Sequence, residues 1–207
     1  KNIRVESIFS LDDFTEALGV KNKIVADNTP CLMPYTTQWK FSSPKPNYKY
    51  VVAKSQPVLD EEFIYFGSDS GLFWALRQSD GSTAWSYKVG HHPKGKTIFS
   101  SPALYKDLVI FGSYDGNVYA LEKVTGKKRW VNFDADWVGS SPAIAEDLGL
   151  VFIGLEFGLF KKHGGIMALD ATTGEKAWHY TSMPCFTHSS PLYIKEHQQV
   201  IVGSNDG

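Results

Sequence analysis

Short apolar runs separated by turn residues recur along this chain, and residues 100–130 show one period of the pattern most clearly. Strand-forming residues occupy 101–104, 108–112, 117–121 and 128–133. The pairs Asp115-Gly116 and Thr125-Gly126 separate the last three of these runs. Such pairs tolerate the positive φ that a tight hairpin turn requires. The pattern therefore predicts four short antiparallel strands joined by tight turns.

The same pattern recurs at 55–85 and at 140–178, and a fourth copy begins at Ser189 and is interrupted at Gly207. Four short strands in every period of about 40–50 residues are the signature of a propeller blade. The aromatic and β-branched content argues against a helical solenoid. We therefore expect an all-β propeller of four-stranded antiparallel blades. The blades should lie at about 55–90, 100–134 and 140–182, with an incomplete blade at 189–207.

Residues 1–34 do not fit the repeat and predict a leader or linker. A capping signal at 10–13 and a glycine stop at Gly19 indicate a short helix over 11–18. This segment is either a surface leader or a docking arm. Residues 35–41 centre on Trp39, which precedes Trp85 by 46 positions and is in phase with the repeat. They predict the last strand of a blade whose other strands lie elsewhere, within a propeller domain that spans 35–207.

Composition narrows the class of protein. The 207 residues are 43% hydrophobic and 21% charged, with a formal charge of −1. This balance argues against a nucleic-acid-binding protein, which normally carries a basic stripe. No apolar run approaches the length of a membrane-spanning helix. Cys31 and Cys185 have no metal-binding spacing, which favours two unpaired thiols and leaves a disulfide as the alternative.

A tryptophan closes each copy of the repeat. The pattern Ala-x-Asp-x-x-x-Gly-x-x-x-Trp stands complete from Ala168 to Trp178, and Glu122 or Arg77 replaces the aspartate in the other two copies. This pattern resembles the tryptophan-docking repeat of the quinoprotein (PQQ) dehydrogenase-like β-propellers. That superfamily contains PQQ enzymes and non-catalytic relatives such as the outer-membrane assembly factor BamB. The resemblance covers about residues 35–207 and favours the non-catalytic, BamB-like branch.

The resemblance has two structural implications. Such rings close with about seven or eight blades, so this chain, with about 3.5–4 blades, is expected to be a partial propeller. Each motif tryptophan is expected to pack across a blade junction, where its large ring and single N–H donor both find partners. The expected structural docking residues are Trp39, Trp85, Trp130 and Trp178.

The informative positions are those that break the repeat. The residue before each Ser-Ser-Pro or Ser-Gln-Pro copy is Lys54, Phe99, Gly139 and His188 in turn. In propellers the first strands line the central channel, whose entrance is the usual ligand site. The sequence therefore predicts a funnel lining of Lys54, Phe99, Trp137 and His188. Between the second-strand glycine and the third-strand alanine the third copy has six extra residues, which predict an exposed binding loop at 155–165.

No catalytic motif or metal-ligand set is recognisable, so we expect no catalytic residues, no metal and no cofactor. The favoured function is a non-catalytic scaffold that binds a protein or a ligand. Its partner would be another protein or the remaining blades of the same propeller. One alternative is part of a PQQ-dependent alcohol or sugar dehydrogenase, with PQQ and calcium ligands outside this chain. A second is a sensor domain of a larger signalling protein. Family analogy favours an extracytoplasmic or periplasmic location.

Overall fold

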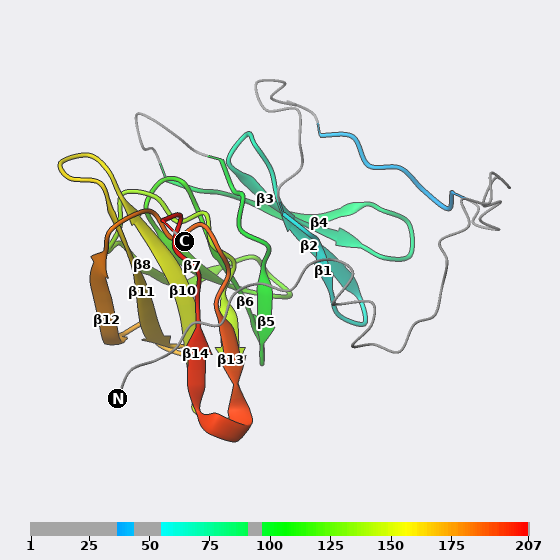
Figure 1. Ribbon diagram of the computed structural model, residues 1–207. Coiled ribbons are helices and arrows are strands. Elements are labelled where there is room, and N and C mark those ends of the chain that lie inside the picture. The colour runs from blue at the N-terminus through cyan, green and yellow to red at the C-terminus, as the bar shows by residue number, and fades with distance from the viewer. Residues whose placement is uncertain (1–36, 44–54, 91–96, 207) are drawn as a thin grey trace, which may run out of the picture. The chain divides into compact units, whose positions relative to one another are not determined.

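The computed structural model describes residues 37–43, 55–90 and 97–206, and within these it is built from β-strands (Figure 1). The first sheet, blade 1, has the order β1-β2-β3-β4. Its strands are β1 (Val58–Leu59), β2 (Phe63–Gly67), β3 (Leu72–Arg77) and β4 (Thr83–Lys88). Each strand pairs antiparallel with the next, because tight turns connect consecutive strands.

Two further sheets repeat this order. Blade 2 contains β5 (Ala103–Tyr105), β6 (Leu108–Gly112), β7 (Val118–Glu122) and β8 (Lys128–Asn132). Blade 3 contains β9 (Ala143–Ala145), β10 (Leu150–Phe157), β11 (His163–Asp170) and β12 (Lys176–Met183). A fourth sheet holds β13 (Leu192–Ile194) and β14 (Gln199–Ile201), joined by the 3-10 turn η1 (Lys195–His197). The predicted all-β propeller with four-stranded antiparallel blades is confirmed.

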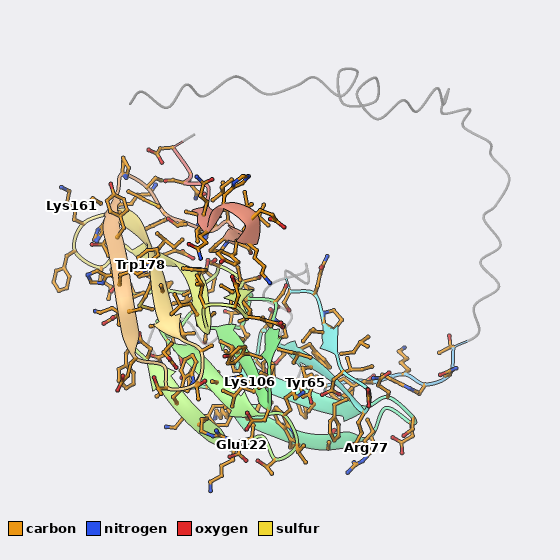
Figure 2. The ribbon with its side chains drawn as sticks, turned by 90° about the horizontal axis from the view of Figure 1, so that it is seen from below. Tyr65, Arg77, Lys106, Glu122, Lys161 and Trp178 are labelled. Carbon is orange, nitrogen blue, oxygen red and sulfur yellow. The ribbon has the colours of Figure 1, made fainter. Side chains whose placement is uncertain are left out.

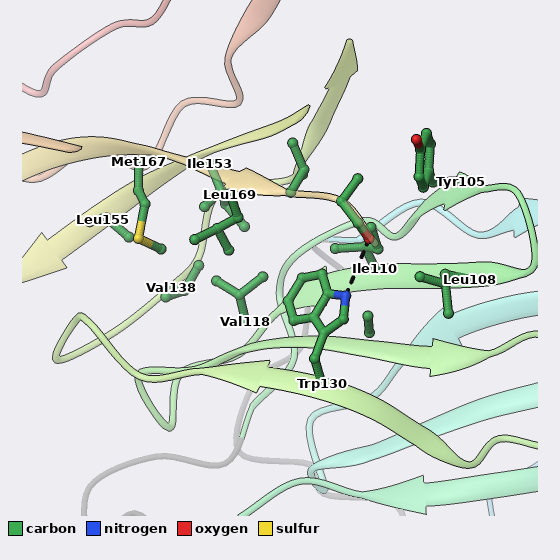
Figure 3. Close-up of a cluster of buried hydrophobic side chains, with 13 residues drawn as sticks. Tyr105, Leu108, Ile110, Val118, Trp130, Val138, Ile153, Leu155, Met167 and Leu169 are labelled. Atoms are coloured by element: carbon green, nitrogen blue, oxygen red, sulfur yellow. Dashed lines mark hydrogen bonds between the residues drawn. The ribbon is translucent and has the colours of Figure 1, made fainter. Parts of the chain in front are cut away.

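The hydrophobic core lies between consecutive blades. One cluster joins Phe73 of blade 1 to Phe111 of blade 2, whose rings stack with centroids 4.0 Å apart. A second cluster joins the other face of blade 2 to β10 and β11 of blade 3, and includes Ile110, Ile153 and Met167 (Figure 3). Strands of blades 2 and 3 are therefore apolar on both faces. This explains the nearly continuous apolar runs in the sequence.

Three of the four motif tryptophans cross from one repeat to the next in the same way. The indole Nε1 of Trp39 donates to the carbonyl of Gln78 at 2.9 Å, that of Trp85 to Lys123 at 2.8 Å, and that of Trp130 to Ala171 at 3.2 Å (Figure 3 for Trp130). Each ring lies against the glycine three residues after its acceptor. A Cβ added at Gly81, Gly126 or Gly174 would approach the ring to 2.5 Å. These glycines also have positive φ, which glycine adopts without steric cost.

The fourth tryptophan has a different environment. Trp178 is 42% exposed, whereas Trp130 is 7% exposed. Within the described residues no hydrogen bond of the Trp178 indole is present, and its ring contacts Phe152 of its own blade at 5.8 Å. The expected placement of Trp178 across a blade junction is therefore absent from the part of the chain that the structure describes.

The segment around Trp39 also differs from expectation. Residues 37–43 form no strand, because no described neighbouring strand pairs with them. Phe41 instead covers one face of blade 1, with edge-to-face contacts to Phe66 and Trp74 at 5.8 and 5.2 Å. The helix expected at 11–18 and Cys31 lie outside the described residues, and Cys185 is a free, half-buried thiol.

The paired serines that open each repeat link the blades at their first strands. The first serine binds its own blade, where Ser140 Oγ accepts the Gly154 N–H at 3.0 Å, and it also donates to the Ser189 carbonyl of the next repeat at 2.9 Å. The second serine binds the preceding blade. Three such bonds run in a row: Gln56 N to Ser101 Oγ at 2.8 Å, Ser101 N to Ser141 Oγ at 2.9 Å, and Ser141 N to Ser190 Oγ at 3.1 Å. Because β5 lies beside β9 and β9 beside β13, we call this row of first strands and the residues just before them the inner rim.

The insertion of the third copy is mostly strand, and the expected loop is limited to five residues. Leu155 pairs with Gly165 and Phe157 with His163, so β10 and β11 extend through most of the segment. Only residues 158–162 remain as the turn. The strands extend because both sides continue to pair in register, which satisfies the backbone groups that a loop would leave to water.

Candidate binding pocket at the inner rim

A pocket of about 290 Å³ opens at the inner rim and draws on three consecutive repeats. Blade 2 supplies Phe99 and Tyr114, whose rings meet edge to face at 4.8 Å. Blade 3 and the fourth sheet complete the lining. The lining residues are Phe99, Tyr114, Gly139, Ser141, His188 and Ser190.

The repeat frame explains why these residues converge. Phe99, Gly139 and His188 occupy the same position of successive copies, just before the paired serines. The frame holds each of these segments through an equivalent backbone bond. The amide of Tyr114 donates to Thr97 O, that of Glu156 to Trp137 O and that of Asn205 to Phe186 O, at 3.0 to 3.1 Å. Constant backbone bonds thus present variable side chains to one space.

Glu156 lies beneath this pocket and is only 1% exposed. Its Oε1 accepts the Gly139 N–H at 3.1 Å and lies 3.1 Å from Nδ1 of His188. Burial raises the pKa of Glu156, while His188, the Gly139 amide and the Tyr114 hydroxyl oppose this rise. Unlike Glu156, His188 reaches solvent, with 43% of its side chain exposed. The pair therefore connects a buried carboxylate to the pocket surface.

Gly139 makes this close approach possible. A Cβ at this position would lie 2.8 Å from Glu156 Oε1 and 3.2 Å from the Tyr114 hydroxyl. Any side chain here would displace the carboxylate or fill the pocket.

Two of the four predicted funnel residues, Phe99 and His188, line this pocket. Trp137 does not line it. Its ring packs against Gly158 under the β10–β11 turn and reaches His188 only through Phe186, with ring centroids 6.1 and 5.7 Å apart. Lys54 lies outside the described residues.

Sequence reasoning missed Glu156 and Tyr114. Both stand two positions after the glycine of the second strand, where the four copies read Asp69, Tyr114, Glu156 and Asn205. This position varies as the predicted funnel positions do, and that variation is the signal that identifies it.

The pocket does not fit a calcium site. Calcium takes about six to eight oxygen ligands, and the carboxylate here is already bonded to a histidine and an amide. Among the described residues, no three His, Cys, Asp or Glu side chains are placed to hold a metal ion. In the same part of the chain, no helix is long and apolar enough to cross a membrane.

Comparison with known proteins agrees with this architecture. The repeats and sheets define a β-propeller of the PQQ-like repeat class. Residues 36–184 match the family described as "Outer membrane protein assembly factor BamB". The match spans more than half of the chain, and the chain belongs to this family. No curated protein sequence matches it.

Solved structures share the fold at low sequence identity. BamB from Moraxella catarrhalis is 19% identical with a TM-score of 0.60, and the match covers 82% of this chain and 47% of that one. A europium-containing methanol dehydrogenase is 21% identical with a TM-score of 0.54, over 60% of this chain and 24% of that one. The computationally designed Ika4 protein is 14% identical with a TM-score of 0.62, and the match covers 84% of this chain and 94% of that one. The match thus covers less than half the length of each of the first two proteins.

Proposed function

We propose that this chain is a non-catalytic part of a β-propeller that acts as a binding scaffold, with the inner-rim pocket as its recognition site. One observation carries the proposal. Three successive repeats place different residues, Phe99, Gly139 and His188, at one equivalent position around a common pocket. A purely structural frame has no need for such variation, whereas a binding site requires it.

The pocket chemistry favours a small group of hydrogen-bond acceptors attached to an apolar body. Ser141 and Ser190 accept backbone amides through Oγ, and within the described residues neither hydroxyl proton has an acceptor. His188 binds Glu156 through Nδ1, which leaves Nε2 as the ring nitrogen for a ligand. Phe99 supplies the apolar wall. An aromatic or aliphatic carboxylate combines both features.

Sodium benzoate is the probe for this proposal, with neutral benzamide as its matched analogue. In a two-dimensional NMR titration we expect the Gly139 amide and the His188 ring signals to shift saturably with benzoate. Substitution His188→Ala should weaken benzoate binding about tenfold, as loss of a charge-assisted bond requires. His179→Ala, at an exposed position of β12, is the control and should have no effect. Equal binding to the wild type and the His188→Ala variant would overturn the site.

The enzymatic alternative has its own test. The resemblance and the methanol dehydrogenase neighbour make PQQ with calcium the relevant addition. If the scaffold proposal is right, PQQ and calcium produce neither a shifted absorbance spectrum nor dye-linked alcohol oxidation. Either signal would contradict a non-catalytic role.

A further inference from the structure

The extended hairpin of blade 3 ends in a turn whose base is fixed on both sides. The Asp136 carboxylate accepts the N–H groups of Gly158 and Leu159 at 2.7 and 2.8 Å. Trp137 packs against Gly158, where a Cβ would lie 2.6 Å from its ring. On the other side His163 stacks on Phe157 with centroids 4.4 Å apart. The base of the turn is therefore held by contacts that a freely solvated turn does not need.

The tip of this rigid turn is apolar and cationic. Phe160 is fully exposed and Leu159 is 42% exposed. Lys161 and Lys162 follow them, and Figure 2 shows Lys161 on the outside of the hairpin turn. Because the backbone before Phe160 is held, binding at this site would need to order its side chain but not the turn, which favours its use as an interface anchor.

A groove of about 500 Å³ adjoins the tip. The hairpin supplies its cationic side, and β12 with the residues after it supplies its floor. Gly164 permits this arrangement, because its missing Cβ would lie 2.1 Å from the Cys185 carbonyl. The lining residues are Lys161, Lys162, His163, Thr181, Ser182, Met183 and Pro184. These lining residues include two lysines, a histidine and two hydroxyls, and no carboxylate.

We propose that this groove and the Phe160 tip bind an acidic segment of a partner protein. Carboxylates of that segment would lie against Lys161 and Lys162, and an adjacent apolar side chain would pack on Phe160. The proposal deepens the binding-scaffold role by assigning a partner chemistry to a surface separate from the inner-rim pocket. Its support is charge complementarity: the groove offers donors and positive charge to an anionic group.

The shape of the site favours a polypeptide over an anionic membrane. A lipid surface is flat and would meet only the tip, leaving the hydroxyls of Thr181 and Ser182 in the groove unused. A chain segment can enter the groove and use the tip and the floor together.

The test is fluorescence anisotropy with a short labelled peptide in which glutamates flank a phenylalanine pair. Peptides with glutamine or lysine in place of glutamate are the matched probes. We expect the glutamate peptide to bind at least about tenfold more tightly than either analogue, with an affinity that falls as salt rises. Phe160→Ser and the pair Lys161→Glu with Lys162→Glu should each weaken binding about tenfold or more.

The controls separate this proposal from the others. Reversal of Lys127 and Lys128 to glutamate, at the exposed start of β8 in blade 2, should leave peptide binding unchanged. His188→Ala should also leave it unchanged, so that failure of the inner-rim pocket and failure of the groove are distinguishable. Equal binding of the three peptides would overturn the proposal. Binding to phosphatidylserine vesicles that the glutamate peptide does not displace would also overturn it, in favour of a membrane.

Discussion

The junction between blades 2 and 3 contains the whole tryptophan–glycine motif, whereas at the junction between blade 3 and the fourth sheet the described residues supply the tryptophan and only two strands of the following sheet. At the first, Trp130 lies against Gly174, donates to Ala171 and is 7% exposed. At the second, Trp178 keeps the same place in the sequence but is 42% exposed (Figure 2). The comparison teaches that the tryptophan is not a structural element by itself. It becomes one where the glycine turn of the following blade covers it.

Replacing the motif tryptophan with alanine should give the largest difference in lost stability between the two junctions. Trp130→Ala removes a buried ring and its hydrogen bond, and we expect a loss of about 3–5 kcal/mol in the free energy of unfolding. Trp178→Ala removes a half-exposed ring, and we expect about 1 kcal/mol. Urea denaturation followed by circular dichroism measures both. Equal losses at the two positions would mean that the Trp178 ring is covered in solution.

Substitution of Gly174, the glycine that packs against Trp130, should cause the next largest loss of stability. Gly174→Ala introduces a Cβ at φ +74°, 2.5 Å from the Trp130 ring, and should cost about 2–3 kcal/mol from backbone strain and overpacking. Gly149→Ala is the matched control. It has φ +65°, but its new Cβ meets only the Tyr105 hydroxyl at 3.5 Å.

For this control about 1 kcal/mol is expected, from strain alone. Denaturant midpoints of the two variants give the comparison. If both variants lose the same stability, the ring contact at Gly174 contributes nothing beyond the backbone conformation.

At the inner rim, equivalent serines of blade 3 and the fourth sheet should differ less in their contribution to stability. Ser140 is buried and its Oγ accepts the Gly154 amide, so Ser140→Ala leaves a buried N–H without its partner and should cost about 1–3 kcal/mol. Ser189 makes the equivalent bond to Gly203 in the exposed fourth sheet. Water can replace it there, and Ser189→Ala should cost about 0.5 kcal/mol. Thermal unfolding of both variants tests the difference, and a larger loss at Ser189 would contradict it.

The sequence was sufficient for the fold because the fold is a repeat. Three full copies and one incomplete copy repeat the same short apolar runs, with Asp115-Gly116 and its counterparts as turns, so each copy supports the strand assignment in the others. The paired serines that open each repeat could be recognised in the sequence, but their role depends on which blade each hydroxyl binds. That relation appears only when Ser101 and Ser141 come together across 40 residues.

The sequence predicted only part of the pocket, because only some of its residues stand at positions that were recognised as variable. Phe99 and His188 were found because they vary within a constant frame. Glu156 was missed because it lies in the inserted segment, whose residues looked like a loop. The extension of β10 places it in register opposite Gly164 and buries its carboxylate, so only the comparison of equivalent positions in the four copies could have found it.

The contact between Glu156 and His188 joins blade 3 to the residues before the fourth sheet. Titration of Glu156 should change the free energy of unfolding least among these predictions. The pKa of Glu156 is raised by burial above its ordinary value near 4.5. The folded state therefore favours the protonated acid, and this contribution to stability is lost as pH rises through the folded-state pKa. Unfolding free energies of the wild type and Glu156→Gln, measured from about pH 4 to pH 8, should diverge, with the wild type declining relative to the variant.

Substitution His188→Ala sharpens the prediction, because it removes a group that opposes the rise in the Glu156 pKa. The decline of stability with pH should then become steeper than in the wild type, and the double variant with Glu156→Gln should lose that steepness. A pH profile unchanged by His188→Ala would mean that the two residues do not interact in solution. In that case the bond from the Ser141 N–H to Ser190 Oγ would be the contact that joins the fourth sheet to blade 3 at the pocket.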